Sequence, residues 1–137
     1  MNLKKLFLKH CIKKKFEINQ SQIETVNHLQ DYYTQNFKKY FFNKLFNKKE
    51  NKIGFYLTGD VGVGKTMILN FFFDHIKEKK LRLHFNEFMI NFHDYIFENK
   101  HKKRNNEIDY FVKDLKKKVD LIYFDEFQVT NIVDAMI

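Results

Sequence analysis

Eight consecutive residues combine the types that bind phosphate: Gly59-Asp60-Val61-Gly62-Val63-Gly64-Lys65-Thr66. All four glycines of the chain lie within the eleven residues 54–64. Glycine permits positive φ and leaves room for a ligand close to the backbone. The spacing matches G-x-x-x-x-G-K-[ST], the phosphate-binding loop or Walker A pattern. The segment therefore predicts a site for a nucleoside triphosphate.

Each part of this loop has an expected role. Successive N–H groups of a glycine-rich loop form a nest for anions, and the helix that follows adds about half a positive charge at its N-terminus. Lys65 is expected to reach the β- and γ-phosphates, and the Thr66 hydroxyl to ligate Mg²⁺. Gly54, in the strand expected before the loop, indicates close packing. The alternative interpretation is a glycine turn followed by a surface lysine.

A second chemical feature is a pair of acids directly after an apolar segment. Asp125 and Glu126 follow Leu121–Phe124. In a Walker B arrangement the first acid holds Mg²⁺ through its water shell, and the second polarises the attacking water as general base. Because a kinase excludes water, Glu126 favours hydrolysis over phosphorylation of a small molecule. The alternative is two exposed acids that open a loop.

Strands and helices must alternate to position these residues. Hydrophobic patterns predict strands at 53–58, 81–85 and 121–124, and helices at 66–77, from Asn86, and around 108–115. Strands that alternate with helices indicate βαβ units. We therefore expect an α/β fold with a parallel sheet and flanking helices.

The N-terminal part has a different pattern. Ser21-Gln22-Ile23-Glu24 has the S-x-x-E form of a capping box, so a helix is expected from near Ser21. Apolar residues at helical spacing predict a second helix around Phe37–Leu45. We interpret residues 1–50 as an N-terminal helical arm and residues 51–137 as the P-loop core.

Composition narrows the classes of partner and compartment. Lys and Arg outnumber Asp and Glu by 25 to 17, which favours polyanions such as nucleic acid. The abundance of Lys, Asn, Phe and Ile is instead typical of an AT-rich coding sequence, so nucleic acid is the less favoured partner. The single Cys11 supports neither a disulfide framework nor a thiolate metal site, which fits the cytoplasm. No segment approaches the roughly 20 apolar residues of a transmembrane helix.

Three segments resemble the ZapE-like ATPases, the AAA+ cell-division ATPases of bacteria and their mitochondrial relatives: FYLTGDVGVGKTMILNFFF, HFNEFM and FDEFQVTNIVDAMI. The resemblance implies a P-loop ATPase that uses ATP and Mg²⁺ and acts as a homo-oligomer. It also implies a role at the division ring or in membrane-protein quality control, with a protein partner there. Carried over by position, it assigns the phosphate loop and the two acids to Gly59, Gly62, Gly64, Lys65, Thr66, Asp125 and Glu126. Gln22 falls where the family has a glutamine ahead of the core, near the adenine.

The sequence also departs from the family pattern. Asp60 and Val63 stand where the family has glycine and a polar or basic residue, and Asn131 replaces an aspartate. Asn86 and Glu87 replace a His-Arg pair. These changes put partner contacts in doubt more than nucleotide binding.

The order of strands in AAA+ sheets raises a further expectation. In such a sheet, another strand lies between the P-loop strand and the strand that carries Asp125. The resemblance implies that this strand, its polar sensor and an arginine finger lie beyond Ile137. We therefore expect the N-terminal portion of such an ATPase, with impaired turnover.

Two other functions remain as alternatives. A nucleotide-dependent interaction or nucleic-acid-binding module without significant hydrolysis would use the lysine-rich surface, and a steep salt dependence of DNA binding would identify it. A P-loop kinase or helicase-loader relative is disfavoured by the FDEF segment.

Overall fold

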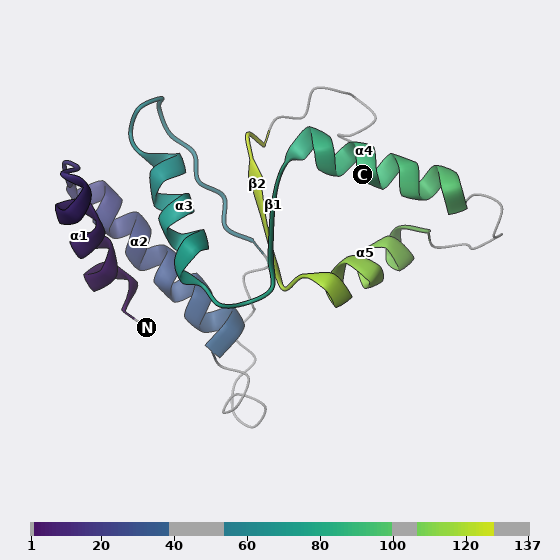
Figure 1. Cartoon of the computed structure of the whole chain (residues 1–137), viewed down its shortest axis with the longest axis horizontal. Coiled ribbons are helices and arrows are strands. Elements are labelled where there is room, and N and C mark those ends of the chain that lie inside the picture. Colours follow the sequence, from purple (N-terminus) through teal and green to yellow (C-terminus); the bar gives the residue numbers. More distant parts are fainter. Residues whose placement is uncertain (1, 39–53, 100–106, 128–137) are drawn as a thin grey trace. The chain divides into compact units, whose positions relative to one another are not determined.

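The structure is a computed structural model that describes residues 2–38, 54–99 and 107–127. Contacts divide the chain into two compact units, Met1–Ile76 and Lys77–Ile137 (Figure 1). We call them the N-terminal unit and the C-terminal unit and describe each by itself. The division at residues 50 and 51 into an arm and a core stays a prediction.

The N-terminal unit consists of helices and of the loop that carries the glycines. It contains, in chain order, α1 (Leu3–Lys14), α2 (Gln20–Tyr33), the π-helical turn η1 (Thr34–Lys38) and α3 (Lys65–His75). Helices α1, α2 and α3 contact one another (Figure 1). Helix α3 confirms the predicted helix after the glycine loop. The helix predicted around Phe37–Leu45 lies largely outside the described residues.

Helix α2 begins at Gln20, which confirms the helix predicted from near Ser21, but its capping residue is Asn19 and not Ser21. The Asn19 side chain accepts a hydrogen bond from the Gln22 N–H at 2.9 Å, and the Gln22 side-chain oxygen accepts one from the Asn19 N–H at 3.5 Å. Asparagine caps a helix as well as serine does, and this reciprocal pair satisfies two N–H groups at once. Gln22 thereby occupies the third position of α2.

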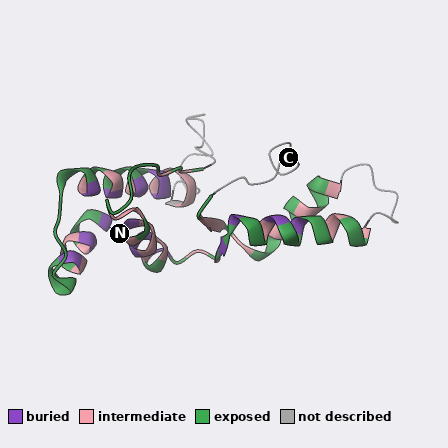
Figure 2. Cartoon of the chain, turned by 90° about the horizontal axis from the view of Figure 1, so that it is seen from above, coloured by how far each residue is buried: buried purple, intermediate pink, exposed green. Residues whose placement is uncertain are grey.

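The core of the N-terminal unit is formed by apolar residues from all three helices, which appear as buried positions in Figure 2. Leu3, Phe7 and Cys11 of α1 are fully buried. The Phe7 ring packs edge-on against Phe71 of α3, with centroids 5.2 Å apart. Helix α1, which the sequence analysis did not predict, is therefore anchored directly to the helix that follows the glycine loop.

The strand predicted at 53–58 is wrong for its described part. Residues 54–58 alternate between exposed and half-buried positions, as in a strand, but form no ladder with any other residue that the structure describes. A strand requires a hydrogen-bonded neighbour, and the sheet of the described residues consists of two other strands. Instead, the centre of the Phe55 ring lies 6.1 Å from the centre of the Tyr32 ring on α2. The close packing predicted at Gly54 is also not seen, since a Cβ there would meet no described atom within 4 Å.

The C-terminal unit contains a parallel pair of strands and two helices. Strand β1 (Lys80–His84) leads into α4 (Phe85–Asn99), and α5 (Glu107–Lys118) leads into β2 (Leu121–Asp125). The strands pair in parallel, with Arg82 opposite Tyr123 and His84 opposite Asp125. Both strands and the predicted helices around them are confirmed to within about a turn, and the parallel sheet is confirmed for these two strands.

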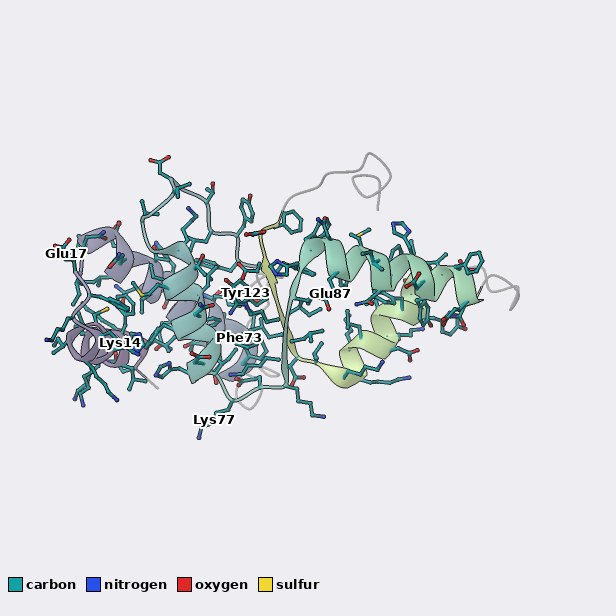
Figure 3. The ribbon with its side chains drawn as sticks, turned by 45° about the horizontal axis from the view of Figure 1, so that its top comes forward. Lys14, Glu17, Phe73, Lys77, Glu87 and Tyr123 are labelled. Atoms are coloured by element: carbon teal, nitrogen blue, oxygen red, sulfur yellow. The ribbon has the colours of Figure 1, made fainter. Side chains whose placement is uncertain are left out.

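One face of this sheet carries the core. The ring of Phe124 lies 5.7 Å from Phe85 and 5.0 Å from Phe88, both on α4. Side chains alternate between the faces of a strand. Arg82, Tyr123 and Asp125 therefore share the other face, and Tyr123 is labelled on β2 in Figure 3. None of the helices described is long and apolar enough to cross a membrane.

Candidate functional site

Three glycines of the loop have backbone φ values that residues with a side chain adopt only with strain. Gly59, Gly62 and Gly64 have φ values of 150°, 87° and 87°. Such values lie in the region that L side chains rarely occupy. A Cβ on Gly62 would meet nothing within 4 Å, so open space borders the loop there among the described residues. The three glycines thus give the loop its shape.

The loop ends at the N-terminus of α3. Gly64 is the N-cap residue, and none of the described side chains caps the helix. The N–H of Ile68 bonds to the Gly64 carbonyl at 3.0 Å and starts the helical ladder. The N–H groups of the first turn have no partner within the helix itself, and the helix dipole makes this end positive. The end of the loop is therefore suited to an anion.

The Lys65 side chain folds back over the loop. Its Nζ donates to the carbonyl oxygen of Gly59 at 2.7 Å and to that of Asp60 at 2.5 Å. The ammonium group thus sits inside the curve of the same segment whose glycines open it. The ammonium group therefore lies where it would neutralise the charge of a phosphate chain bound by the loop.

Gln22 supports the loop from α2. Its Nε2 donates to the Val63 carbonyl oxygen at 3.3 Å, and a Cβ built on Gly64 would lie 3.1 Å from the same nitrogen. Gln22 is buried, with 8% of its surface exposed. The family resemblance implies a place for Gln22 near the adenine, but no local sequence pattern indicates its contact with the loop.

Alanine at Gly62 and at Gly64 is expected to destabilise the protein unequally. Both positions have a φ of 87°, so each substitution carries a similar backbone strain of about 1 kcal/mol. At Gly64 the new methyl group would also lie 3.1 Å from Gln22 Nε2, which adds about 1 kcal/mol of overpacking. Urea denaturation should give Gly64→Ala a lower free energy of unfolding than Gly62→Ala. In the Gln22→Ala background the difference should disappear, and its persistence would contradict this contact.

The two acids lie at the end of β2 in the C-terminal unit. Asp125 is the last residue of the strand, and Glu126 follows with a φ of 51°. Positive φ at Lys15 has a different cause, because Lys15 is the C-cap of α1. Glu126 ends no helix; after it the chain turns, and the centre of the Phe127 ring lies 4.4 Å from that of the Phe85 ring. The Glu126 side chain is exposed at this turn.

Asp125 is held by two neighbours that the sequence analysis missed. Arg82 of β1 forms an ion pair with one Asp125 oxygen, and the Tyr123 hydroxyl donates to the other at 3.4 Å. The Arg82 guanidinium also lies 5.0 Å from the centre of the Tyr123 ring. The hydrogen bond from Arg82 lowers the pKa of Asp125 below its ordinary value of 3.8, against the opposing effect of burial. Asp125 is therefore kept as a carboxylate.

Replacement of Arg82 by methionine should raise the Asp125 pKa and lower stability at neutral pH. A carboxyl group whose pKa is lower in the folded state than in the unfolded state stabilises the fold at pH values above its unfolded-state pKa. This contribution is lost as the pH falls below 3.8. Because Arg82 is 39% exposed, we expect about 1 kcal/mol or less at pH 7.

Carboxyl NMR titration and urea denaturation at pH 7 and pH 3 measure these effects. Lys117→Met is the control, because it breaks the more exposed pair with Asp114 at 2.9 Å and should leave Asp125 unchanged. An Asp125 pKa that stays the same in Arg82→Met would contradict the account of this pair.

The oxygen groups of the two segments fit Mg²⁺. The ion prefers hard oxygen ligands, keeps several waters and takes one or two carboxylates together with phosphate oxygens. The Thr66 side chain is exposed beside the loop, and Asp125 is a half-buried carboxylate. Thr66 belongs to the N-terminal unit and Asp125 to the C-terminal unit, and the assignment of both residues to one ion stays a prediction.

Comparison with known proteins gives the class of the protein. The model of the family described as AFG1-like ATPase matches residues 1–137, and the chain belongs to this family. The resemblance to the ZapE-like ATPases is thereby confirmed at the level of the family.

Individual relatives agree with this assignment. The chain is 37% identical over 94 residues to lactation elevated protein 1 homolog B of Danio rerio, which covers 61% of the chain and 19% of that protein. It is 33% identical over 100 residues to cell division protein ZapE of Escherichia coli, covering 69% of the chain and 26% of that protein. The chain thus spans about a fifth to a quarter of these relatives. No solved structure matches it.

Proposed function

We propose that the chain binds Mg·ATP at residues 59–66 and hydrolyses it, as part of a P-loop NTPase fold of the AAA+ type. The observation that carries this proposal is the conformation of the loop. Three glycines at positive φ lead into a helix whose start no described side chain caps. The Lys65 ammonium lies within the curve of that loop. This is the combination that phosphate binding requires.

The proposed roles follow from the chemistry of each group. Backbone N–H groups of the loop bind phosphate oxygens, Lys65 neutralises the β- and γ-phosphates, and Thr66 and Asp125 would hold Mg²⁺. Bound Mg²⁺ would neutralise charge on the phosphate oxygens. Glu126 accepts a proton from the water that attacks the γ-phosphorus, the bond to the bridging oxygen breaks, and ADP and phosphate leave. The left-handed backbone of Glu126 supports this role, since such residues cluster at functional sites.

Titration with a fluorescent ATP analogue and a phosphate-release assay test the proposal. We expect saturable binding that requires Mg²⁺ for full affinity, and release of phosphate above the no-protein background. Binding of DNA with a steep salt dependence, in the absence of nucleotide binding, would favour a nucleic-acid-binding module instead.

The wider biological assignment is also part of the proposal. We infer a cytoplasmic ATPase that acts as a homo-oligomer and contacts a protein of the cell-division or membrane-protein quality-control machinery. The name of the Escherichia coli relative, cell division protein ZapE, supports the first of these roles. Sedimentation with and without ATP tests the oligomer.

A further inference from the structure

Gln22 joins the start of α2 to the glycine loop across 41 residues of sequence. Its side chain is buried, and both of its polar atoms are used inside the protein. The oxygen accepts from the Asn19 N–H, and Nε2 donates to the Val63 carbonyl oxygen. Helices α2 and α3 contact each other in the same unit (Figure 1), so the contact lies between packed elements.

The bond to Val63 fixes the direction of a neighbouring N–H group. The peptide between Val63 and Gly64 is trans, since none of the described peptide bonds is cis. In a planar trans peptide the C=O and the N–H point in opposite directions. With its carbonyl held toward Gln22, this peptide directs the Gly64 N–H away from α2. Gly64 could otherwise turn easily, because glycine has few preferred conformations.

We propose that Gln22 is a positioning residue for phosphate binding. It holds the Val63–Gly64 peptide so that the Gly64 N–H faces the phosphate side of the loop, next to the first turn of α3. This inference rests on the proposed function and adds to it a residue from outside the motif. It also makes the start of α2 sensitive to the loop, because the same side chain completes the helix cap.

A contact of Gln22 with the adenine base is less compatible with the observed bonds. The side-chain oxygen and one N–H of the amide are already bonded to Asn19 and Val63. One N–H remains, and a base read by an amide usually engages both the oxygen and the nitrogen of that amide. The geometry therefore favours a role toward the phosphates, which every nucleotide shares.

Gln22→Glu separates loop positioning from helix capping. Glutamate keeps the length of the side chain and an oxygen that can accept from Asn19, as in a regular capping box, but it cannot donate to Val63. Gln22→Met removes both bonds without adding charge. Gln20→Glu adds the same charge to the exposed first residue of α2 and serves as the control.

Binding of ATP, GTP and inorganic tripolyphosphate to the full chain is the measurement. Both Gln22 variants should bind all three about tenfold more weakly, as expected for one misdirected hydrogen bond to a charged group, with the ratio of ATP to GTP affinity unchanged. Gln20→Glu should bind like the wild type. Gln22→Glu places a carboxylate at a buried position beside a carbonyl oxygen, so its melting temperature should fall. The affinities are therefore compared at a temperature at which circular dichroism shows every variant to be fully folded, so that a tenfold loss reports on the loop and not on unfolding.

Two results would overturn this inference alone. The first is wild-type affinity in Gln22→Glu while Lys65→Ala has lost binding. The second is a loss confined to ATP, with tripolyphosphate binding intact, which would place Gln22 at the base. Failure of the wild type to bind any of the three ligands would instead overturn the proposed function together with this inference.

Discussion

Lys65→Ala is expected to weaken ATP binding by about a hundredfold, which removes measurable binding at ordinary concentrations. Lys65 Nζ lies within 2.7 Å of a loop carbonyl, so the ammonium group is already held inside the loop. Its loss removes charge-assisted hydrogen bonds to phosphate, which are worth about 1.5–3 kcal/mol. Isothermal titration with ATP and Mg²⁺ measures the effect.

The control for this variant is Lys9→Ala. Lys9 is exposed on α1, and its replacement changes the net charge by the same amount. It should bind ATP like the wild type. A similar loss in both variants would show that general electrostatic attraction, and not the loop, accounts for binding.

Glu126→Gln should give the opposite pattern, with binding retained and turnover lost. Glutamine has the size of glutamate but cannot accept the proton of the attacking water. Loss of a general base costs about 10²–10⁴ in rate. ATP affinity should stay near that of the wild type, because the proposed phosphate contacts come from the loop in the other unit. Phosphate release and ATP titration on the same sample separate the two effects.

Glu87→Gln is the matched control, since Glu87 is an exposed acid of the same unit, on α4 (Figure 3). It should leave turnover unchanged. If Glu126→Gln lost binding as fully as Lys65→Ala, the division of roles between the two residues would be contradicted.

Local patterns predicted those elements whose signals lie within a few residues. Apolar and polar side chains alternate along 81–85, residues 121–124 are an apolar run, and both segments contribute to strands. The helix after the loop begins at Lys65, within a residue of its predicted start, because the glycines end directly before it. Helix α1 was missed although Leu3, Phe7 and Cys11 follow one another at intervals of four, since six lysines surround this short apolar stripe.

Contacts between distant parts of the chain could not be predicted from the sequence. Segment 54–58 has the alternation of a strand but no ladder partner among the described residues. Arg82 meets Asp125 because of the register of two parallel strands, 43 residues apart. Gln22 meets Val63 because Asn19 caps α2 and the start of this helix packs near the loop. None of these depends on periodicity or on a motif.

The central claim is that the glycine loop and the two acids act on one triphosphate. A crystal structure of the chain with Mg²⁺ and a non-hydrolysable ATP analogue tests it most directly. We expect phosphates bound by the N–H groups at residues 62–66, Lys65 at the β- and γ-phosphates, and Asp125 and Glu126 facing the metal and the γ-phosphate. A triphosphate bound elsewhere, or acids that lie remote from Thr66, would contradict it.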